Sequence, residues 1–237
     1  MCPDATNPSR ENNWQMFDRI AHRYDLLNHL LSFDIDRRWR RRVNEFLPKG
    51  DRLDVLDLAC GTGDQLLALY SGGRVQSGVG IDLAENMLAL GRRKIDAAGL
   101  GDRLQLQTGD AQRLAFADGT FDVVTISFGI RNMVDVGLAL CEMLRVLRPG
   151  GRALVLEFSL PRSRLTRSVY LFYLRHILPR LGRALSGNSE AYRYLNRTIE
   201  TFPDGEAFCR LMTDSGFNRV RHSPLTFGIA TIYAGDK

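Results

Sequence analysis

The chain has 237 residues, of which 44% are hydrophobic and 25% charged, a balance typical of a globular protein that buries one sizeable core. No stretch approaches 18 uncharged apolar residues, and the polar start MCPDATNPSRENN lacks the order of a signal peptide, so we expect a cytoplasmic protein with a disordered tail over 1–13. The net charge is +5, and all but three of the 32 basic residues are arginines, concentrated at 37–42 and between 162 and 183.

Neither the cysteines nor the histidines show the spacing of a metal site. The cysteines are Cys2, Cys60, Cys141 and Cys209, and the histidines are His22, His29, His176 and His222. The cysteines are far apart and form no C-x-x-C pair, which predicts free thiols and argues against zinc. We therefore expect no metal.

Strands and helices alternate through most of the chain. Residues 14–47 have apolar positions at helical spacing and predict an N-terminal helical cap. Strands are expected at 53–58, 75–81, 104–108, 121–127 and 152–158, and helices at 64–70, 84–98 and 137–147. This alternation predicts a Rossmann-like α/β fold, in which a mostly parallel sheet carries helices on both faces.

The last third of the chain changes character. Helical segments are expected over 160–200, as an insert over the substrate site, and another helix follows Pro203. Two strands that meet near Ser223 and Pro224 end the chain as an antiparallel hairpin, which makes the sheet seven-stranded. We therefore expect a single domain over 14–237.

A glycine turn follows the first predicted strand. The stretch VLDLACGTGD, residues 55–64, places Asp57 in the strand and Gly61 and Gly63 in the turn, where glycine lets the backbone approach a ligand closely. A dinucleotide site needs a third glycine, and Asp64 stands where a pyrophosphate would need positive potential. The turn therefore favours a cationic nucleoside without phosphates, such as S-adenosylmethionine.

Two further acidic residues follow neighbouring predicted strands. Asp82 ends the second strand, where a carboxylate can accept both hydroxyls of a ribose. Asp110 follows the third strand and is placed to meet the adenine amino group, with Leu83 or Ala111 against the ring. Each residue alone is more often a helix cap or a solvated side chain. Their combination predicts a class I methyltransferase, which needs positioning of the reacting atoms and no metal.

Three longer segments resemble the ubiquinone/menaquinone biosynthesis C-methyltransferases. YDLLNHLLSFDIDRRWRR is similar to that family's first signature, and FDVVTISFGIRNMVD with LALCEMLRVLRPGGRALVLEFS is similar to its second. AYRYLNRTIETFPD and TFGIATIYAG are similar to its C-terminal region. The resemblance spans residues 14–235, and FGIRN and YRYL are its most specific parts. It implies that S-adenosylmethionine methylates a ring carbon of a prenylated hydroquinone.

The resemblance also implies which residues bind. It implies that Thr62, Asp82, Asp110, Ala111 and Ser127 contact S-adenosylmethionine. With the residues singled out above, the predicted cofactor contacts are Asp57, Gly61, Thr62, Gly63, Asp82, Leu83, Asp110, Ala111 and Ser127, and the predicted substrate contacts are Asn28, Phe128 and Tyr192. One departure is plain, because Asp34 and Asp36 stand where the family's S-x-G-x-H-R-x-W pattern has glycine and histidine. The proton transfer assigned to that histidine therefore has no residue to carry it here unless Asp36 substitutes for the histidine.

Methylation at carbon requires an activated ring. A hydroquinol hydroxyl resembles that of tyrosine, with a pKa of about 10, so the site must stabilise an oxyanion or supply a base. Arg131 is predicted to stabilise the oxygen charge, and Asn132 to orient the hydroxyl. The alternative for Arg131 is a salt bridge to Asp135 or an interaction with a helix end.

The helical cap carries the remaining catalytic candidates. Tyr24 and Asn28 lie four residues apart and are predicted to close over substrate and cofactor, with helix capping and core packing as the alternative. The identity of the base is open between Asp25, His29 and Asp36, directly or through water.

The segment between Glu157 and Glu190 contains no acidic residue but six arginines, interleaved with SVYLFYLRHILPRLG. A basic, aromatic and apolar segment is typical of contact with anionic lipid, and a polyprenyl quinol resides in the bilayer. We therefore expect peripheral contact with the inner face of the membrane. A helix pair in the core with a solvated arginine face is the alternative.

Two other functions compete with quinol methylation. A pI near 9.2 and the stretch RRWRRR fit an RNA methyltransferase, although no RNA-binding module is visible and we expect no nucleic-acid partner. An inactive cofactor-binding partner of quinone-pathway enzymes has no need of the intact site residues. TFGIATIYAG favours demethylmenaquinol over the benzoquinol of ubiquinone synthesis, but both rings offer the same hydroxyl beside a reactive carbon. The prenyl chain length and a homodimer stay open.

Overall fold

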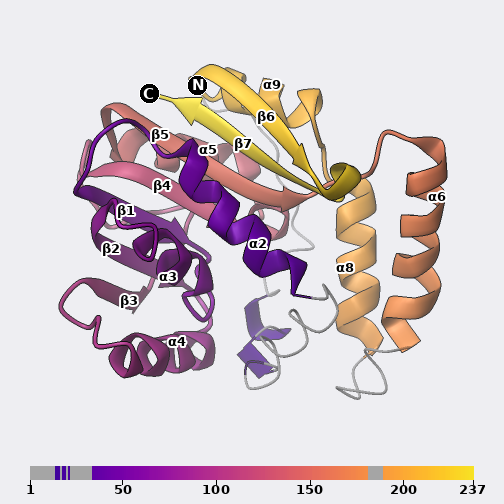
Figure 1. Cartoon of the computed structure of the whole chain (residues 1–237), viewed down its shortest axis with the longest axis horizontal. Helices are drawn as coiled ribbons and strands as arrows, with labels where there is room; N and C mark the ends of the chain where they lie inside the picture. The colour runs from indigo at the N-terminus through magenta and orange to yellow at the C-terminus, as the bar shows by residue number, and fades with distance from the viewer. Residues whose placement is uncertain (1–13, 17, 20, 22–33, 181–188) are drawn as a thin grey trace.

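A seven-stranded sheet forms the centre of the molecule (Figure 1). The computed structural model describes residues 14–16, 18, 19, 21, 34–180 and 189–237, with 189–193 by backbone alone. The strands are β1 (Leu53–Leu58), β2 (Val75–Asp82), β3 (Leu104–Thr108), β4 (Phe121–Ser127), β5 (Leu147–Phe158), β6 (Asn218–Leu225) and β7 (Ala230–Asp236). Their order is β3-β2-β1-β4-β5-β7-β6; β7 pairs antiparallel with β5 and β6, and all other pairs are parallel. The predicted Rossmann-like sheet with an antiparallel C-terminal hairpin is confirmed.

Helices cover both faces of this sheet. They are α2 (Ile35–Arg42), α3 (Asp64–Tyr70), α4 (Glu85–Ala97), α5 (Val136–Val146), α6 (Arg164–Phe172), α8 (Ser189–Thr201) and α9 (Glu206–Asp214). One apolar core joins the sheet to α5 and α9, and a second core on the other face joins it to α2, α3 and α4. A third, small cluster lies between α6 and α8, beside the sheet (Figure 1). The middle strands are buried on both faces, which explains their nearly continuous apolar sequence.

The described part of the N-terminal region contacts α4. Asp18 accepts hydrogen bonds from the backbone N and the Nδ2 of Asn86, at 2.8 and 2.7 Å, in the first turn of α4. Asp34, just before α2, has a φ of 58°, a left-handed conformation that aspartate tolerates better than most residues. The residue that stands in place of the family's glycine therefore keeps the backbone that a glycine would adopt.

Two expectations are wrong in detail. The turn between the last two strands is Thr226–Gly228, not Ser223-Pro224, and Pro224 pairs with Thr231 inside the edge strand β6. An edge strand accepts proline because one side of its backbone has no ladder partner. Cys60 and Cys209 are free thiols, but Cys141 is disulfide-bonded to a partner outside the described residues. Cysteines far apart in sequence carry no spacing signal for such a bond.

The described helices are all too short or too polar to cross a bilayer. The predicted tail over 1–13 lies outside the described residues.

Candidate functional site

A cavity of about 270 Å³ opens where the parallel strands end. The strand order reverses between β1 and β4, and ligands of open α/β sheets bind at such a point. Its lining comes from the loops after β1, β2, β3 and β4, with one contribution from the N-terminal region. The lining residues are Trp14, Ala59, Gly61, Asp82, Leu83, Ala84, Met87, Gly109, Asp110, Ala111, Gln112, Ser127, Phe128, Gly129, Asn132, Met133 and Val134.

The backbone is strained at two corners of this cavity. Ala59 follows β1 with a φ of 48°, and Phe128 follows β4 with a φ of 60°. Non-glycine residues rarely adopt this left-handed conformation, and when they do they gather at functional sites. Gly61, with a φ of 54°, completes the turn after β1 without that cost. The strain therefore marks the ends of the two central strands as the place where a ligand is held.

Asp82 connects two of the loops. Its Oδ2 accepts a hydrogen bond from the Gly61 backbone N at 2.8 Å, and its Oδ1 accepts one from the Ala84 N at 2.9 Å. Each oxygen keeps a further acceptor position for a ligand. Burial raises the pKa of the Asp82 carboxyl, and the two backbone N–H groups oppose that rise. Asp82 thus holds the glycine turn in place and still presents a carboxylate to the cavity.

The charge of the cavity wall selects its ligand. Asp82 and Asp110 line it, and no lysine or arginine is among the described lining residues. Asp110 accepts from the Gln112 backbone N at 2.9 Å through Oδ1. A wall with two carboxylates favours a cation over a phosphate-bearing ligand.

The comparisons with known proteins decide the family. The model of the ubiE/COQ5 methyltransferase family matches residues 6–237. The chain belongs to this family. It is 47% identical over 223 residues to the ubiquinone/menaquinone biosynthesis C-methyltransferase UbiE of Geobacter sulfurreducens, covering 94% of this chain and 87% of that one. It is 48% identical over 222 residues to the demethylmenaquinone methyltransferase of Thermus thermophilus, covering 94% and 100%.

Solved structures share the fold of this methyltransferase at lower identity. A SAM dependent methyltransferase from Aquifex aeolicus has a TM-score of 0.59 at 15% identity, over 83% of this chain and 88% of that one. The [4+2]-cyclase SpnF has a TM-score of 0.66 at 16% identity, over 100% and 99%. Because a cyclase carries the same fold, fold alone does not decide the chemistry. Family membership implies S-adenosylmethionine as methyl donor, and the acidic cavity wall fits a sulfonium.

The cavity gathers many but not all of the predicted residues of this methyltransferase. Those that line it are Gly61, Asp82, Leu83, Asp110, Ala111, Ser127, Phe128 and Asn132. Those that are described but do not line it are Asp57, Thr62, Gly63, Arg131 and Asp36. Tyr24, Asn28, Asp25, His29 and the side chain of Tyr192 lie outside the described residues.

Asp57 lies in β1, beneath the glycine turn. It is buried, its Oδ1 accepts a hydrogen bond from the Thr125 hydroxyl at 2.6 Å, and its Oδ2 has no partner among the described groups. Burial raises the pKa of Asp57 from 3.8 to about 7, against the opposing effects of Thr125 and Arg40. The carboxylate therefore adds negative potential under the turn at a cost in stability.

That cost predicts a pH dependence. Between pH 4 and 7 the unfolded chain ionises at position 57 while the folded chain keeps its proton, so this group lowers stability as the pH rises through that window. Asp57→Asn removes the effect, and its stability relative to the wild type should increase by roughly 2–4 kcal/mol from pH 4 to pH 8. Urea unfolding at both pH values measures this. Asp214→Asn, at an exposed position, is the matched control, and parallel profiles for Asp57→Asn and the wild type would contradict the prediction.

Arg131 contacts neither the cavity, as the predicted role requires, nor Asp135. Its Nη1 lies 2.5 Å from Glu157 Oε1 and donates to the Phe128 carbonyl at 2.7 Å. Both members of the ion pair are buried. Asp135, the partner suggested by sequence, instead caps α5 by accepting from the Leu138 N at 2.9 Å. The guanidinium is thus tied to the strained corner at Phe128.

Asp36 is also buried and does not line the cavity. Its carboxylate lies 3.8 Å from the Nε of Arg40, one turn further along α2. The Arg40 guanidinium lies 5.3 Å from the centre of the Phe128 ring. Asp36 therefore sits in the contact between α2 and the cavity wall.

The glycine turn has supports that sequence reasoning missed. Lys94 of α4 donates to the Thr62 hydroxyl at 2.8 Å and to Asp64 at 2.6 Å, which balances the charge of Asp64. A Cβ on Gly91 would lie 2.9 Å from the Thr62 backbone, so glycine is needed for α4 to approach the turn. Gly91 was the available signal in the sequence, because a glycine inside a helix lowers its stability and is explained only by close packing or function.

A second support links α2 to the cavity. The Ser127 hydroxyl donates to Gln65 Oε1 at 3.0 Å, and Gln65 Nε2 donates to the Arg40 carbonyl at 3.3 Å. On the other side, Tyr194 of α8 donates its hydroxyl proton to Asn132 Oδ1 at 3.0 Å. The helical region after β5 thus contacts a residue of the cavity wall.

Proposed function

We propose that this methyltransferase transfers the methyl group of S-adenosylmethionine to a ring carbon of a prenylated hydroquinone, converting demethylmenaquinol to menaquinol. The observation that carries the proposal is the cavity at the strand ends, whose described wall holds two carboxylates and no basic side chain. The named activities of the relatives at 47% and 48% identity supply the substrate class.

The cofactor is held by the loops after β1, β2 and β3. Asp82 accepts the ribose hydroxyls, while Asp110 accepts from the adenine amino group and Leu83 and Ala111 flank the ring. When bound, the sulfonium supplies an electrophilic methyl group. Asp57 acts from below the turn through its charge, and Thr62 and Gly63 act by shaping the turn.

The substrate lies against the corner formed by Phe128 and Asn132. Asn132 orients the reacting hydroxyl, and its own orientation is set by the bond from Tyr194. Arg131 keeps Phe128 and Asn132 in place from behind, since its guanidinium is held between Glu157 and the Phe128 carbonyl. This positioning role replaces the direct stabilisation of oxygen charge expected from sequence. Tyr24, Asn28 and Tyr192 complete the substrate side in this proposal, and Asp36 is a base only through water.

The test is methyl transfer from labelled S-adenosylmethionine to chemically reduced demethylmenaquinone and to the reduced benzoquinone precursor, side by side. The oxidised quinones serve as controls, because their ring carbon is not a nucleophile. Label on reduced demethylmenaquinone alone supports the proposal. Label on the benzoquinol alone would show that the substrate ring is the benzoquinol and not the naphthoquinol. Label in RNA, or cofactor binding without transfer to either ring, would overturn it.

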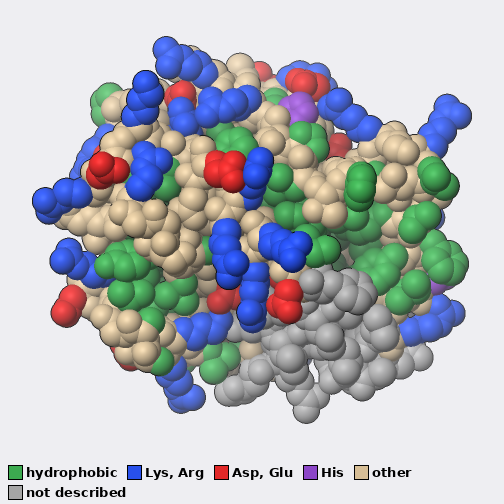
Figure 2. Space-filling model, in the orientation of Figure 1, with side chains coloured by type: hydrophobic (Ala, Val, Ile, Leu, Met, Phe, Trp, Pro, Cys, Tyr) green, Lys and Arg blue, Asp and Glu red, His purple; other side chains and the backbone are tan. Residues whose placement is uncertain are grey.

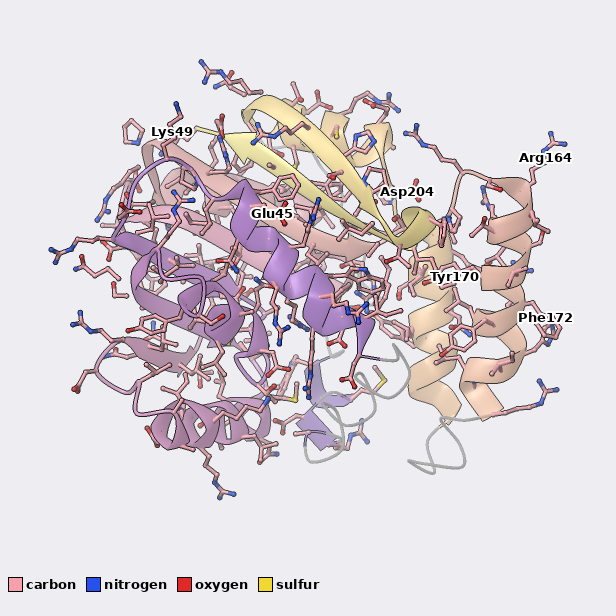
Figure 3. The ribbon with its side chains drawn as sticks, in the orientation of Figure 1. Glu45, Lys49, Arg164, Tyr170, Phe172 and Asp204 are labelled. Atoms are coloured by element: carbon pink, nitrogen blue, oxygen red, sulfur yellow. The ribbon has the colours of Figure 1, made fainter. Side chains whose placement is uncertain are left out.

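We further propose that the outer face of α6 docks on anionic membrane, where the polyprenyl quinol resides. Leu165, Val169 and Phe172 follow helical spacing and are 77%, 63% and 58% exposed. Figure 2 shows apolar side chains gathered over this part of the surface, and in Figure 3 Phe172 points away from α8 while Tyr170 points toward it. Arg164 and Arg167, both exposed, add positive charge on the same helix.

The turn between β6 and β7 adds a second exposed anchor. Phe227 is 84% exposed and has a φ of 59°, a strained conformation for an aromatic residue. The turn is held by a hydrogen bond from Trp39 Nε1 to the Thr226 hydroxyl at 2.8 Å and by one from the Ser159 hydroxyl to the Gly228 carbonyl at 2.8 Å. An exposed phenylalanine on a fixed turn fits insertion among lipid headgroups.

Flotation with phosphatidylglycerol vesicles tests this surface. The double variant Val169→Ser/Phe172→Ser should reduce the bound fraction at least about fivefold, because it removes apolar area that would be buried in lipid. Leu138→Ser, at an exposed apolar position on α5, is the matched control and should float like the wild type. Binding should also fall with added salt. A wild-type protein that stays in the soluble fraction at low salt would refute the docking surface.

A further inference from the structure

Three side chains of metal-binding type meet beside the edge of the sheet, outside the cavity. Glu206 and Cys209 lie three residues apart on α9, and His222 lies on the edge strand β6. The Cys209 Sγ is 3.5 Å from His222 Nδ1, and His222 Nδ1 is 3.6 Å from Glu206 Oε1. All three ligand atoms lie within 4.8 Å of one another.

The spacing of these atoms matches a tetrahedral zinc site. Zinc binds thiolate sulfur at about 2.3 Å, imidazole nitrogen at about 2.0–2.1 Å and carboxylate oxygen at about 2.0–2.2 Å. Tetrahedral angles then put neighbouring ligand atoms about 3.3–3.6 Å apart. The observed 3.5 and 3.6 Å separations therefore need little movement of α9 or β6 to receive the ion. Sequence spacing gave no sign of this set, because His222 comes from a different element.

We propose that Glu206, Cys209 and His222 bind Zn²⁺, with water as the fourth ligand. Cys209 is a free cysteine, whose thiol carries a proton before the ion arrives. Coordination releases that proton to solvent, and the thiolate and carboxylate then balance the charge of the ion. The ion joins α9 to the edge strand, whose residues are largely exposed or half-buried.

Arg162 disfavours metal binding at His222, so a variant of Arg162 tests the proposed site. Its Nη2 lies 3.4 Å from His222 Nε2, and as a donor it favours the imidazole tautomer that carries its proton on Nδ1. Metal binding at Nδ1 moves that proton to Nε2, so Arg162 must turn away. Arg162 is exposed and free to do so. Its replacement by glutamine removes a competing cation and leaves all three proposed ligands unchanged in the sequence.

Cobalt substitution of the full-length reduced protein tests the proposal. Co²⁺ in this site should show a thiolate-to-cobalt charge-transfer band and the d–d bands of a tetrahedral ion, at one equivalent. Cys209→Ser should abolish the charge-transfer band, and His222→Gln should weaken Co²⁺ and Zn²⁺ affinity at least about tenfold. Arg162→Gln should tighten both affinities. His176→Gln, at an exposed histidine outside the cluster, is the matched control and should change nothing.

Circular dichroism of each variant separates loss of the site from loss of the fold. Because Arg162→Gln alters an exposed side chain and His222→Gln keeps a polar group at a half-buried position, they test the site even if Cys209→Ser unfolds. A spectrum without the charge-transfer band in the wild type would overturn the proposal. So would equal affinities in the wild type, His222→Gln and Arg162→Gln.

Discussion

Asp82→Asn is expected to weaken S-adenosylmethionine binding by at least about 100-fold. The carboxylate accepts from the backbone N–H groups of Gly61 and Ala84, one on each oxygen. Asparagine has a single acceptor oxygen, so its NH₂ group must face one of these donors and disturb the turn. It also loses the charge that accepts the ribose hydroxyls in the proposed function, and two charge-assisted hydrogen bonds are together worth roughly 3 kcal/mol or more. Calorimetric titration of the cofactor into both proteins measures the loss.

Two matched variants locate the cause of that effect. Asp110→Asn keeps an acceptor for the Gln112 backbone N and should lose only about tenfold, since a single ligand contact changes. Asp214→Asn removes the same charge at an exposed position and should bind like the wild type. If Asp82→Asn binds within threefold of the wild type, the ribose is held elsewhere.

Sequence predicted this part of the site well for a physical reason. The carboxyl ends of parallel strands meet at one edge of the sheet, so Gly61, Asp82 and Asp110 had to come together once the strands were assigned. The strands themselves were visible because buried parallel strands have nearly continuous apolar sequences. The strand bounds 53–58 and 121–127 agree with the structure for this reason, and 104–108 agrees because apolar and polar residues alternate along that edge strand.

The sequence did not predict which side chains from different strands and helices pair with one another. Glu157 looks like one more residue of a buried strand, yet it ion-pairs with Arg131 from the neighbouring strand end. Asp135, named as the alternative partner of Arg131, is close to it along the chain but instead caps the helix that it precedes. Cys209 and His222 were separated for the same reason, because register between a helix and an edge strand is set by packing.

The Arg131–Glu157 pair carries the second large prediction. Arg131→Met leaves Glu157 buried without its cation, and removing one partner of a buried ion pair typically costs 3–5 kcal/mol, so the free energy of unfolding should fall by about that amount. Burial already raises the pKa of Glu157, and only Arg131 and backbone N–H groups oppose that rise. Urea unfolding measures the loss.

The double variant Arg131→Met/Glu157→Met separates stability from catalysis. An apolar pair of similar volume removes the unpaired charge and should restore most of the lost stability. It cannot restore the hydrogen bond from Arg131 to the Phe128 carbonyl, which keeps the strained corner and the adjoining Asn132 in position. We therefore expect kcat for the quinol to stay at least about 100-fold below that of the wild type, the range seen when a positioned donor is lost, while KM for the cofactor changes less than threefold.

This difference between the effects on kcat and KM distinguishes a positioning role of Arg131 from a role in stability alone. A double variant that recovers both stability and kcat would show that the pair only stabilises the fold. Arg131→Lys adds a second comparison, because lysine keeps the charge but lacks the planar guanidinium, which lies 5.2 Å from the centre of the Phe158 ring and whose Nη1 donates to both Glu157 and the Phe128 carbonyl. A positioning role predicts that Arg131→Lys regains stability more than kcat. Full recovery of kcat by lysine would instead point to charge alone as what the site requires.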